Sequence, residues 1–289
     1  MVSRRQAMKV AIIGANGQLG TDIVKAFADE EVIALTQSDI EISDIDSVQR
    51  AFEGIQPDVV VNTAAFLNVD LCEKERAKAF LVNETGALNL ARVLDKRNIP
   101  LLHVSTDYVF DGTKKRPYEE IDAPNPLNVY GESKLAGERA IQANCSRHYI
   151  VRTSGLYGHA KCLAKGSNFI EKILAKSKES PELRVVDDEV LTPTYAFDLA
   201  RQIRTLVQTG HYGLYHATNS GECSWYEFAK EVLKLAGSSK TVVPVGSNMY
   251  PSEVRRPAYS VLENANLRSQ GLDVMPAWQE SLAHYFNRS

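Results

Sequence analysis

The chain has 289 residues, of which 44% are apolar and 24% charged, and a formal net charge of -3 at pH 7. This length and apolar content are enough for one large domain or two joined domains with buried cores, and they exclude a largely disordered chain. The Lys and Arg residues are scattered rather than clustered, so we expect no nucleic-acid partner.

The cysteines and the N-terminal segment indicate the compartment. The four cysteines lie far apart in the sequence, at Cys72, Cys145, Cys162 and Cys223. They form no C-x-x-C pair and no group with His at metal-ligand spacing, so we expect thiols in a reducing compartment and no metal site of this kind. The apolar run at residues 10–13 is too short for a signal-peptide core, and no longer run follows. We therefore expect a cytoplasmic protein without a membrane span.

In the first half of the chain, short β-branched runs alternate with helical patterns. We expect strands at Lys9–Ile13, Glu31–Leu35, 58–62, 101–105 and His148–Thr153, and helices from Gln18, at 44–52, at 77–97 and from Asn128. Strands that are almost continuously apolar and alternate with helices predict a parallel sheet covered on both faces. The fold class is therefore α/β, a doubly wound parallel sheet of the Rossmann type.

The second half has less regular spacing. Here we expect helices at 168–178, 196–209 and Trp225–Leu235, with strands at 183–186 and 213–217. This pattern predicts a smaller C-terminal lobe and a return of the chain into the main sheet at about 190–217.

A glycine-rich turn lies between the first strand and the first helix. The spacing of Gly14, Gly17 and Gly20 is G-x-x-G-x-x-G. Gly14 would permit a tight turn, Gly17 would let the backbone approach a pyrophosphate, and Gly20 would permit close helix packing, while the helix N-terminus offers N–H groups and partial positive charge. An ordinary strand-to-helix turn is the alternative, but the position at the first strand favours a dinucleotide site.

The end of the second strand leaves the choice between NADPH and NADH open. The residues after it are Thr36, Gln37 and Ser38, with no acid for an adenosine ribose and no Arg for a 2′-phosphate. Asp39 and Glu41 follow, and they either contact the ribose and adenine or are simply solvated.

Tyr130 and Lys134 are four residues apart, on one face of the helix that starts near Asn128. Reduction of a ketone by hydride needs a proton at the developing alkoxide, and a free phenol has a pKa near 10. A neighbouring ammonium group is expected to lower the pKa of the phenol, and it can also hold a nicotinamide ribose. A Tyr and a Lys at this spacing also occur on ordinary solvated helices.

Thr106 stands at the end of the fourth predicted strand, on the side of a parallel sheet where ligands bind. Its hydroxyl is expected to bond a substrate carbonyl oxygen and to orient Tyr130. The alternative is a Thr that caps a turn. The order of glycine loop, strand-end hydroxyl and Tyr/Lys helix predicts Thr106, Tyr130 and Lys134 as a catalytic group.

Segments along nearly the whole chain resemble the dTDP-4-dehydrorhamnose reductase family of the extended short-chain dehydrogenase/reductases. The similar segments are residues 14–20, 62–65, 69–70 with 73, 82–86, 105–112, 130–134, 152–154, 193–194 with 198–200, and 256–260. The S-T-D-Y-V-F-D-G string at 105–112 is the most family-specific. The resemblance implies NAD(P)H-dependent reduction of the 4-keto group of dTDP-4-dehydro-6-deoxy-L-mannose to dTDP-L-rhamnose.

The resemblance also implies roles for residues. Residues 1–155 would form the NAD(P)-binding domain and 156–289 mainly the substrate-binding lobe. Gly17, Gln18 and Leu19 would meet the pyrophosphate of the cofactor, Glu41 and Ile42 its adenosine side, Ala64, Ala65 and Phe66 its middle, and Lys134 its ribose. The other expected cofactor-binding residues are Gly14, Gly20, Val104 and Tyr130. Tyr130 would donate the proton, and Thr106, Asp107, Gly155 and Arg256 would contact the substrate. NADPH is the expected cofactor, with NADH also accepted; a need for a divalent metal and a homodimer both stay open.

Three residues on the substrate side depart from the family pattern. Gly155 stands where the family has a Trp that packs on the sugar nucleotide, and Glu189 and Leu191 stand where it has Gln and Gly. Tyr157 is a candidate to fill the space left by the missing Trp. Because of these departures, the sequence supports the class of reaction more strongly than the identity of the sugar substrate.

Other activities are compatible with the same motifs. A 4,6-dehydratase would need a Glu base at the position of Tyr108. Another 4-ketoreductase, or a 4-epimerase that keeps NAD bound, could use the same Thr, Tyr and Lys. The regulatory subunit of methionine adenosyltransferase, which resembles this family, offers a non-catalytic alternative.

Overall fold

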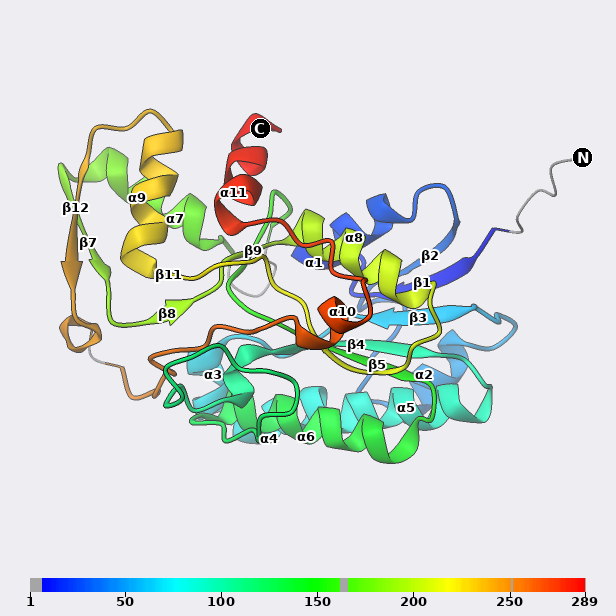
Figure 1. Ribbon diagram of the computed structural model, residues 1–289. Helices are drawn as coiled ribbons and strands as arrows, with labels where there is room; N and C mark the ends of the chain where they lie inside the picture. The colour runs from blue at the N-terminus through cyan, green and yellow to red at the C-terminus, as the bar shows by residue number, and fades with distance from the viewer. Residues whose placement is uncertain (1–6, 162–165, 251, 289) are drawn as a thin grey trace, which may run out of the picture.

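A six-stranded parallel sheet forms the centre of the molecule (Figure 1). The computed structural model describes residues 7–161, 166–250 and 252–288, so Cys162 lies outside the described residues. The strand order is β10-β5-β4-β3-β1-β2. The strands are β1 (Lys9–Ile13), β2 (Glu31–Leu35), β3 (Val59–Asn62), β4 (Leu101–Thr106), β5 (His148–Thr153) and β10 (Gly213–His216). The doubly wound parallel sheet expected from the sequence is confirmed.

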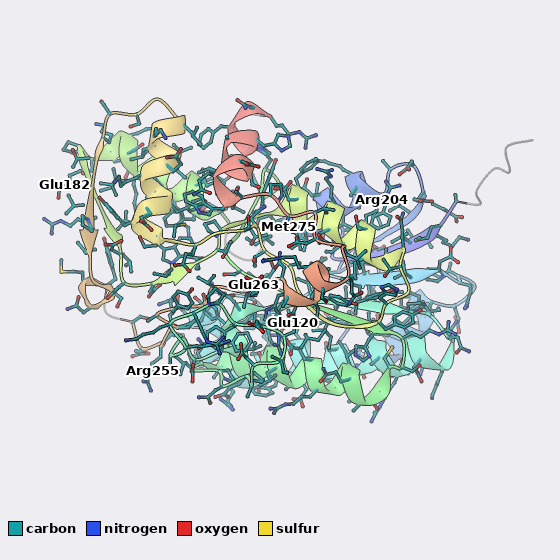
Figure 2. The ribbon with its side chains drawn as sticks, viewed as in Figure 1. Glu120, Glu182, Arg204, Arg255, Glu263 and Met275 are labelled. Carbon is teal, nitrogen blue, oxygen red and sulfur yellow. The ribbon has the colours of Figure 1, made fainter. Side chains whose placement is uncertain are left out.

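Helices cover both faces of this sheet. On one face α1 (Gln18–Ala26) and α8 (Ala196–Val207) share a core with Val10 and Ile12 of β1. On the other face lie α2 (Ile45–Ala51), α5 (Gly86–Lys96) and α6 (Val129–Asn144), as Figure 1 shows. Arg204 of α8 donates two hydrogen bonds to Asp29, at 2.6 and 2.7 Å, and fixes α8 beside the end of α1 (Figure 2).

A smaller lobe lies beyond the carboxyl end of the sheet. Its elements are α7 (Phe169–Glu179), α9 (Trp225–Leu235), α11 (Trp278–Asn287), the pair β7 (Glu182–Val186) and β12 (Thr241–Val245), and the short pairs β8 (Val190–Leu191) with β11 (Cys223–Ser224) and β6 (Leu156–Tyr157) with β9 (Thr194–Tyr195). A small helix, α10 (Ala265–Ser269), packs on β10. The expected return to the main sheet is β10, which pairs with β5.

The helix expected at 77–97 is divided into three parts. It consists of α4 (Arg76–Phe80), a π-helical turn (Leu81–Thr85) and α5, and it is preceded by α3 (Val69–Lys74), which the sequence pattern did not indicate. The π-helical turn contains the buried Asn83, whose side chain bonds the backbone of Phe66 and the hydroxyl of Ser133. Apolar periodicity cannot reveal such a turn, because the wider spacing satisfies these polar contacts.

Helix α6 lies unusually close to its neighbours because of two glycines. A Cβ atom on Gly131 would fall well inside contact distance of the carbonyl oxygen of Tyr108, and one on Gly137 would do the same at the carbonyl oxygen of Asn83. The buried Arg152 of β5 donates to both carboxylate oxygens of Glu138 on α6, at 2.9 and 2.6 Å. These contacts place the first turn of α6 against the end of β4.

We predict that Gly131→Ala lowers the stability of the protein although Ala is the better helix former. The added methyl group meets backbone rather than a movable side chain, and overpacking of this kind costs about 1–3 kcal/mol. Urea denaturation measures the change. Arg139→Ala, on the exposed face of the same helix, is the control and should change stability by less than about 0.5 kcal/mol. Equal stability of Gly131→Ala and wild type would show that α6 can move away.

Candidate functional site

The loop between β1 and α1 has the shape expected of a phosphate-binding turn. Gly14 has φ of 78°, and the N–H of Gly17 donates to the carbonyl oxygen of Gly14 at 2.9 Å. A Cβ on Gly20 would collide with that same carbonyl group. The three glycines therefore make a turn that brings the start of α1 close to the strand.

The start of α1 is open to a ligand. Gly17 is the N-cap of α1 and makes no side-chain capping bond. Gln18 Nε2 is buried and has no hydrogen-bond partner among the described residues. Free N–H groups, the helix dipole and an unpaired buried amide suit the pyrophosphate of a dinucleotide. The residues at this loop thus fit the cofactor that the sequence implies.

In the loop after β2, an acid lies closer to the end of the strand than its position in the sequence suggests. The carboxylate of Asp39 folds back and accepts from the N–H and the hydroxyl of Thr36, at 2.8 and 2.7 Å. These hydrogen bonds hold the pKa of Asp39 below its usual range. An acid therefore does lie at the end of β2 in space, although the three residues that follow the strand are neutral.

Glu41 and Ile42 have local roles in this structure. The Glu41 carboxylate accepts from the N–H and hydroxyl of Ser43, at 3.1 and 2.7 Å. The side chain of Ile42 is buried in the core below the sheet, and its carbonyl oxygen accepts from Asn89 at 3.0 Å. Contacts from Ile42 to a cofactor would have to come from its backbone.

Two buried asparagines hold the segment after β3. Asn62 Oδ1 accepts from the N–H of Ala64 at 3.1 Å, and Asn83 Oδ1 accepts from the N–H of Phe66 at 2.8 Å. The backbone of Ala64–Phe66 is thereby shaped without regular structure. Both asparagines belong to segments that resemble the family, but only the structure shows that they support this loop.

The structure brings Thr106, Tyr130 and Lys134 together at the carboxyl end of β4. The Tyr130 hydroxyl lies near the Thr106 side chain. The Tyr108 ring meets the ring of Tyr130 edge-on, with centroids 5.7 Å apart. Asn128 caps α6 by accepting from the N–H of Gly131 at 2.9 Å, so the first turn of the helix is fixed where Tyr130 stands.

Burial, rather than the lysine charge, dominates the titration of this group. Burial raises the pKa of the Tyr130 phenol, and the nearby Thr106 hydroxyl opposes this in part. The net pKa of Tyr130 therefore lies above its usual value in this arrangement, instead of below it as the sequence led us to expect. Burial also lowers the pKa of Lys134 to about 8, against the opposing charge of Glu138.

The side-chain nitrogen of Lys134 points into the protein. Nζ lies 2.7 Å from the carbonyl oxygen of Val104 and 3.0 Å from Nε2 of His103. Val104, expected as a cofactor residue, thus uses its carbonyl oxygen to anchor the lysine. His103 did not stand out in the sequence, since a single His on an apolar strand is most often only a core residue.

The hydroxyl proton of Thr106 is already engaged in a hydrogen bond. Its hydroxyl donates to Asp107 Oδ1 at 3.0 Å, and the other carboxylate oxygen accepts from Ser154 at 2.8 Å. Burial raises the pKa of Asp107, although Ser260, Ser154 and Thr106 counteract it. Thr106 must turn its proton away from Asp107 before it can donate to a substrate oxygen.

Charged residues border this group on the substrate side. Arg256 donates to Asp70 of α3 at 3.1 Å. Its charge acts on both Tyr108 and Glu189, and burial raises the pKa of the Glu189 carboxyl despite that charge. Glu189, one of the three departures, therefore lies near Tyr108, which follows the carboxyl end of β4.

The structure gives a physical reason for Gly155 and corrects the role considered for Tyr157. Gly155 has φ of 54°, and a Cβ there would lie 2.7 Å from Leu191 Cδ1. Leu191 thus occupies the space in which a side chain at position 155 would begin. Tyr157 is buried in the core of the smaller lobe, where its ring stacks on Tyr195, so it does not fill a substrate pocket.

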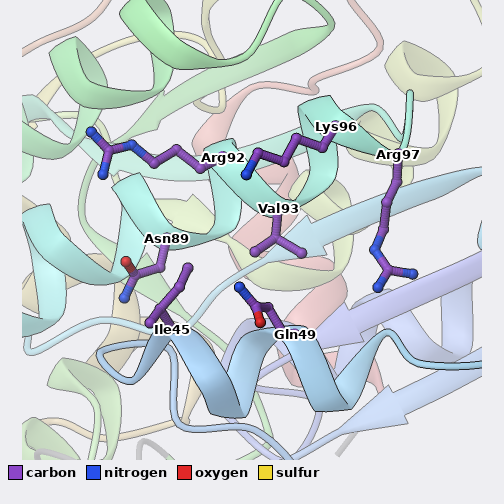
Figure 3. A pocket seen from close by; sticks show the side chains of 7 residues that line it. All are labelled: Ile45, Gln49, Asn89, Arg92, Val93, Lys96 and Arg97. Carbon is purple, nitrogen blue, oxygen red and sulfur yellow. The ribbon is translucent and has the colours of Figure 1, made fainter.

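A cavity of about 430 Å³ lies between α2 and α5 (Figure 3). Its lining residues are Ile45, Gln49, Asn89, Arg92, Val93, Lys96 and Arg97. None of the residues expected to bind cofactor or substrate lines it. We therefore place the site at the carboxyl edge of the sheet and not in this cavity.

A parallel Rossmann sheet, a glycine-rich first turn and a strand-end Thr beside Tyr and Lys on the next helix define an extended short-chain dehydrogenase/reductase. The family described as RmlD substrate binding domain matches residues 8–289. The chain belongs to this family, that of the dTDP-4-dehydrorhamnose reductases.

Three comparisons show the range of relatives. The spore coat polysaccharide biosynthesis protein SpsK of Bacillus subtilis is 42% identical over 96% of each chain. A dTDP-4-keto-6-deoxy-D-glucose reductase of Streptomyces niveus is 39% identical over 95% of each chain. The crystal structure of dTDP-4-dehydrorhamnose reductase from Bacillus anthracis in complex with NADP has a TM-score of 0.93 and 36% identity, covering 98% of this chain and all of that one.

We predict that Gly155→Trp destabilises the protein and that Leu191 is part of the reason. A left-handed conformation costs an L-residue about 1–2 kcal/mol, and the contact with Leu191 adds strain. In a double-mutant cycle with Leu191→Gly, measured by urea denaturation, the pair should be more stable than the sum of the single changes by about 1 kcal/mol or more.

Gly210→Trp is the matched control for this cycle. Gly210 has φ of 71° and nothing within 4 Å of an added Cβ, so this change carries the backbone cost without the contact. It should show no coupling to Leu191→Gly. If the effects at Gly155 and Leu191 were simply additive, the two positions would not compensate each other.

Proposed function

We propose that this protein reduces the 4-keto group of dTDP-4-dehydro-6-deoxy-L-mannose with NADPH and so forms dTDP-L-rhamnose. The observation that carries the proposal is the group of Thr106, Tyr130 and Lys134 at the carboxyl end of β4, on the edge to which the glycine loop also belongs. Membership in the reductase family and the NADP complex of the Bacillus anthracis relative support it.

In this proposal the protein supplies the proton and the geometry. NADPH, when bound, supplies the hydride to the carbonyl carbon. Tyr130 donates its hydroxyl proton to the carbonyl oxygen, which Thr106 orients. The raised pKa of Tyr130 makes the phenol a poor proton donor by itself, so a positive charge on Lys134 is needed to stabilise the phenolate that remains.

We predict that Tyr130→Phe lowers turnover by roughly 10²- to 10⁴-fold and leaves NADPH affinity almost unchanged, because only the proton donor is lost. Lys134→Met should reduce both. Stopped-flow oxidation of NADPH and fluorescence titration of the cofactor measure the two effects. Near wild-type turnover of Tyr130→Phe would exclude it as the donor.

A different 4-ketoreduction is the second candidate. Gly155, Glu189 and Leu191 all alter the substrate side, and the Streptomyces niveus relative carries the name of a reductase of another keto-sugar. A panel of dTDP-, UDP- and GDP-4-keto-6-deoxy sugars decides between them. Tightly bound NAD in the purified protein would favour a 4-epimerase. No oxidation of NADPH with any sugar, together with a stoichiometric synthetase partner, would favour a regulatory role.

The cofactor preference is expected to depend on Asp39. We expect both cofactors to be accepted, with a moderate preference for NADPH. Asp39→Asn should raise the NADPH to NADH ratio of kcat/KM by about 3- to 10-fold, because it removes one charge near a 2′-phosphate, while the amide oxygen can take the place of Oδ2, which accepts from Thr36. Glu53→Gln, beyond the far end of α2, is the control. An unchanged ratio for Asp39→Asn would place the 2′-phosphate elsewhere.

The remaining expectations concern the compartment, the partners and the domain division of the protein. Among the residues described, no helix is long and apolar enough to cross a membrane. We propose a cytoplasmic enzyme whose partner is the nucleotide sugar. The 1–155 and 156–289 division is proposed as the division between cofactor and substrate binding, with a homodimer as a further possibility for size-exclusion measurements.

A further inference from the structure

A buried chain of hydrogen bonds runs behind the catalytic lysine. Asn62 on β3, His103 on β4 and Lys134 on α6 are exposed by only 0, 1 and 2%. Asn62 Nδ2 lies 2.9 Å from His103 Nδ1, and His103 Nε2 lies 3.0 Å from Lys134 Nζ. The chain begins at the N–H of Ala64, which Asn62 Oδ1 accepts at 3.1 Å.

The fixed donor at Ala64 determines the direction of every bond in this chain. A backbone N–H can only donate, so the carbonyl oxygen of the Asn62 amide must face it and the NH₂ group must face His103. Nδ1 of His103 is then an acceptor. A protonated imidazole would set an N–H against the NH₂ of Asn62, so the ring is neutral and carries its proton on Nε2.

The consequence falls on Lys134. Nε2–H of His103 points at Nζ, and an ammonium group has three donors and no lone pair to receive it. The neutral amine can accept from Nε2–H and still donate to the carbonyl oxygen of Val104. Burial, and then the lysine charge, lower the pKa of His103 well below its usual value, so the ring does not yield by taking up a proton.

We propose that His103, oriented by Asn62, is a positioning residue that favours the neutral amine of Lys134 over its ammonium form. This inference rests on the proposed catalytic role of Lys134. The ammonium form, which stabilises the Tyr130 phenolate, then requires a further acceptor at Nζ, such as a ribose hydroxyl. His103 thereby makes the charge of the lysine depend on whether such an acceptor is bound.

Other groups also affect the pKa of Lys134. They are the same in the wild type and in the variants below, so they do not explain a difference between them. Burial lowers the pKa of Lys134 to about 8, and the Glu138 charge raises it. Glu138 is itself neutralised by Arg152. The titratable groups that act on the lysine are His103 on β4 and Glu138 on α6. Those that surround the neighbouring Tyr130 and Thr106 are Asp107 after β4 and Cys72 and Glu73 on α3, and Arg152 of β5 pairs with Glu138.

Two substitutions test the direction of the chain with small changes in shape. His103→Asn places Oδ1 near the position of Nδ1, keeps the bond from Asn62 and removes the donor that faces Lys134. Asn62→Asp is isosteric and presents a second acceptor to His103, which moves the ring proton to Nδ1 and turns Nε2 into an acceptor for the ammonium. Both changes should favour the charged lysine.

The measurement is a pH titration of the Lys134 ¹³Cε resonance in protein labelled with ¹³C-lysine, assigned by its loss in Lys134→Met. We expect a midpoint near pH 8 in the wild type. The midpoint should rise by roughly one pH unit in His103→Asn and by more in Asn62→Asp, whose added charge acts in the same direction. The exposed Lys234 is the internal control, and its resonance should be the same in all three proteins at each pH.

The outcome is independent of the sugar that the protein uses. An unchanged or lower midpoint in His103→Asn overturns the proposal, even if Asn62→Asp shifts upward, because charge alone would then explain the latter. Loss of folding in His103→Asn is checked by thermal unfolding, and His103→Gln, which sets an amide near Nε2, then takes its place with the same expected direction. In an active protein, the alkaline limb of kcat/KM should move with the resonance, while failure of every keto-sugar would count against the proposed function only.

Discussion

The close approach of α6 to the turn after β4 is the constraint on which the site depends. Gly131 and Gly137 leave no side chain between the helix and the carbonyl oxygens of Tyr108 and Asn83. Only at this separation can a Tyr in the first turn of α6 reach a Thr at the end of β4. The Arg152–Glu138 pair adds a buried, doubly hydrogen-bonded link to β5. Because a buried ion pair recovers its desolvation cost only with good geometry, the link also defines where α6 can sit.

Buried amides shape the loops at the carboxyl edge of the sheet. Asn62, Asn83 and Asn128 each bind backbone groups of a segment that has no regular structure of its own. A buried amide left without partners would cost free energy, so each asparagine favours one loop conformation over its alternatives. These loops are therefore preformed by buried side chains.

The two sides of the site differ in how closely they follow the family pattern. The loop from Gly14 to Gly20 and the Thr106, Tyr130 and Lys134 group keep every expected residue, whereas Gly155, Glu189 and Leu191 change together on the substrate side. A proton donor and a phosphate turn tolerate little change in geometry. In the wall of a pocket, a larger side chain at one position can compensate for a smaller one at a neighbouring position. A Leu at position 191 in place of Gly, beside a Gly at position 155 in place of Trp, is a change of this kind.

Local patterns in the sequence predicted the six strands of the central sheet, most of the longer helices and the residue types of the proposed catalytic group, but not α11 or most of the short strands of the smaller lobe. Apolar runs, the glycine spacing and the Tyr130/Lys134 interval each act within a few residues of chain, so they can be interpreted without the fold. Tertiary structure alone decided what joins distant segments: Leu191 fills the space at Gly155, and His103 lies between Asn62 and Lys134. The pKa values of Tyr130 and Lys134 belong to the same class, because burial sets them and burial comes from every element that covers the site.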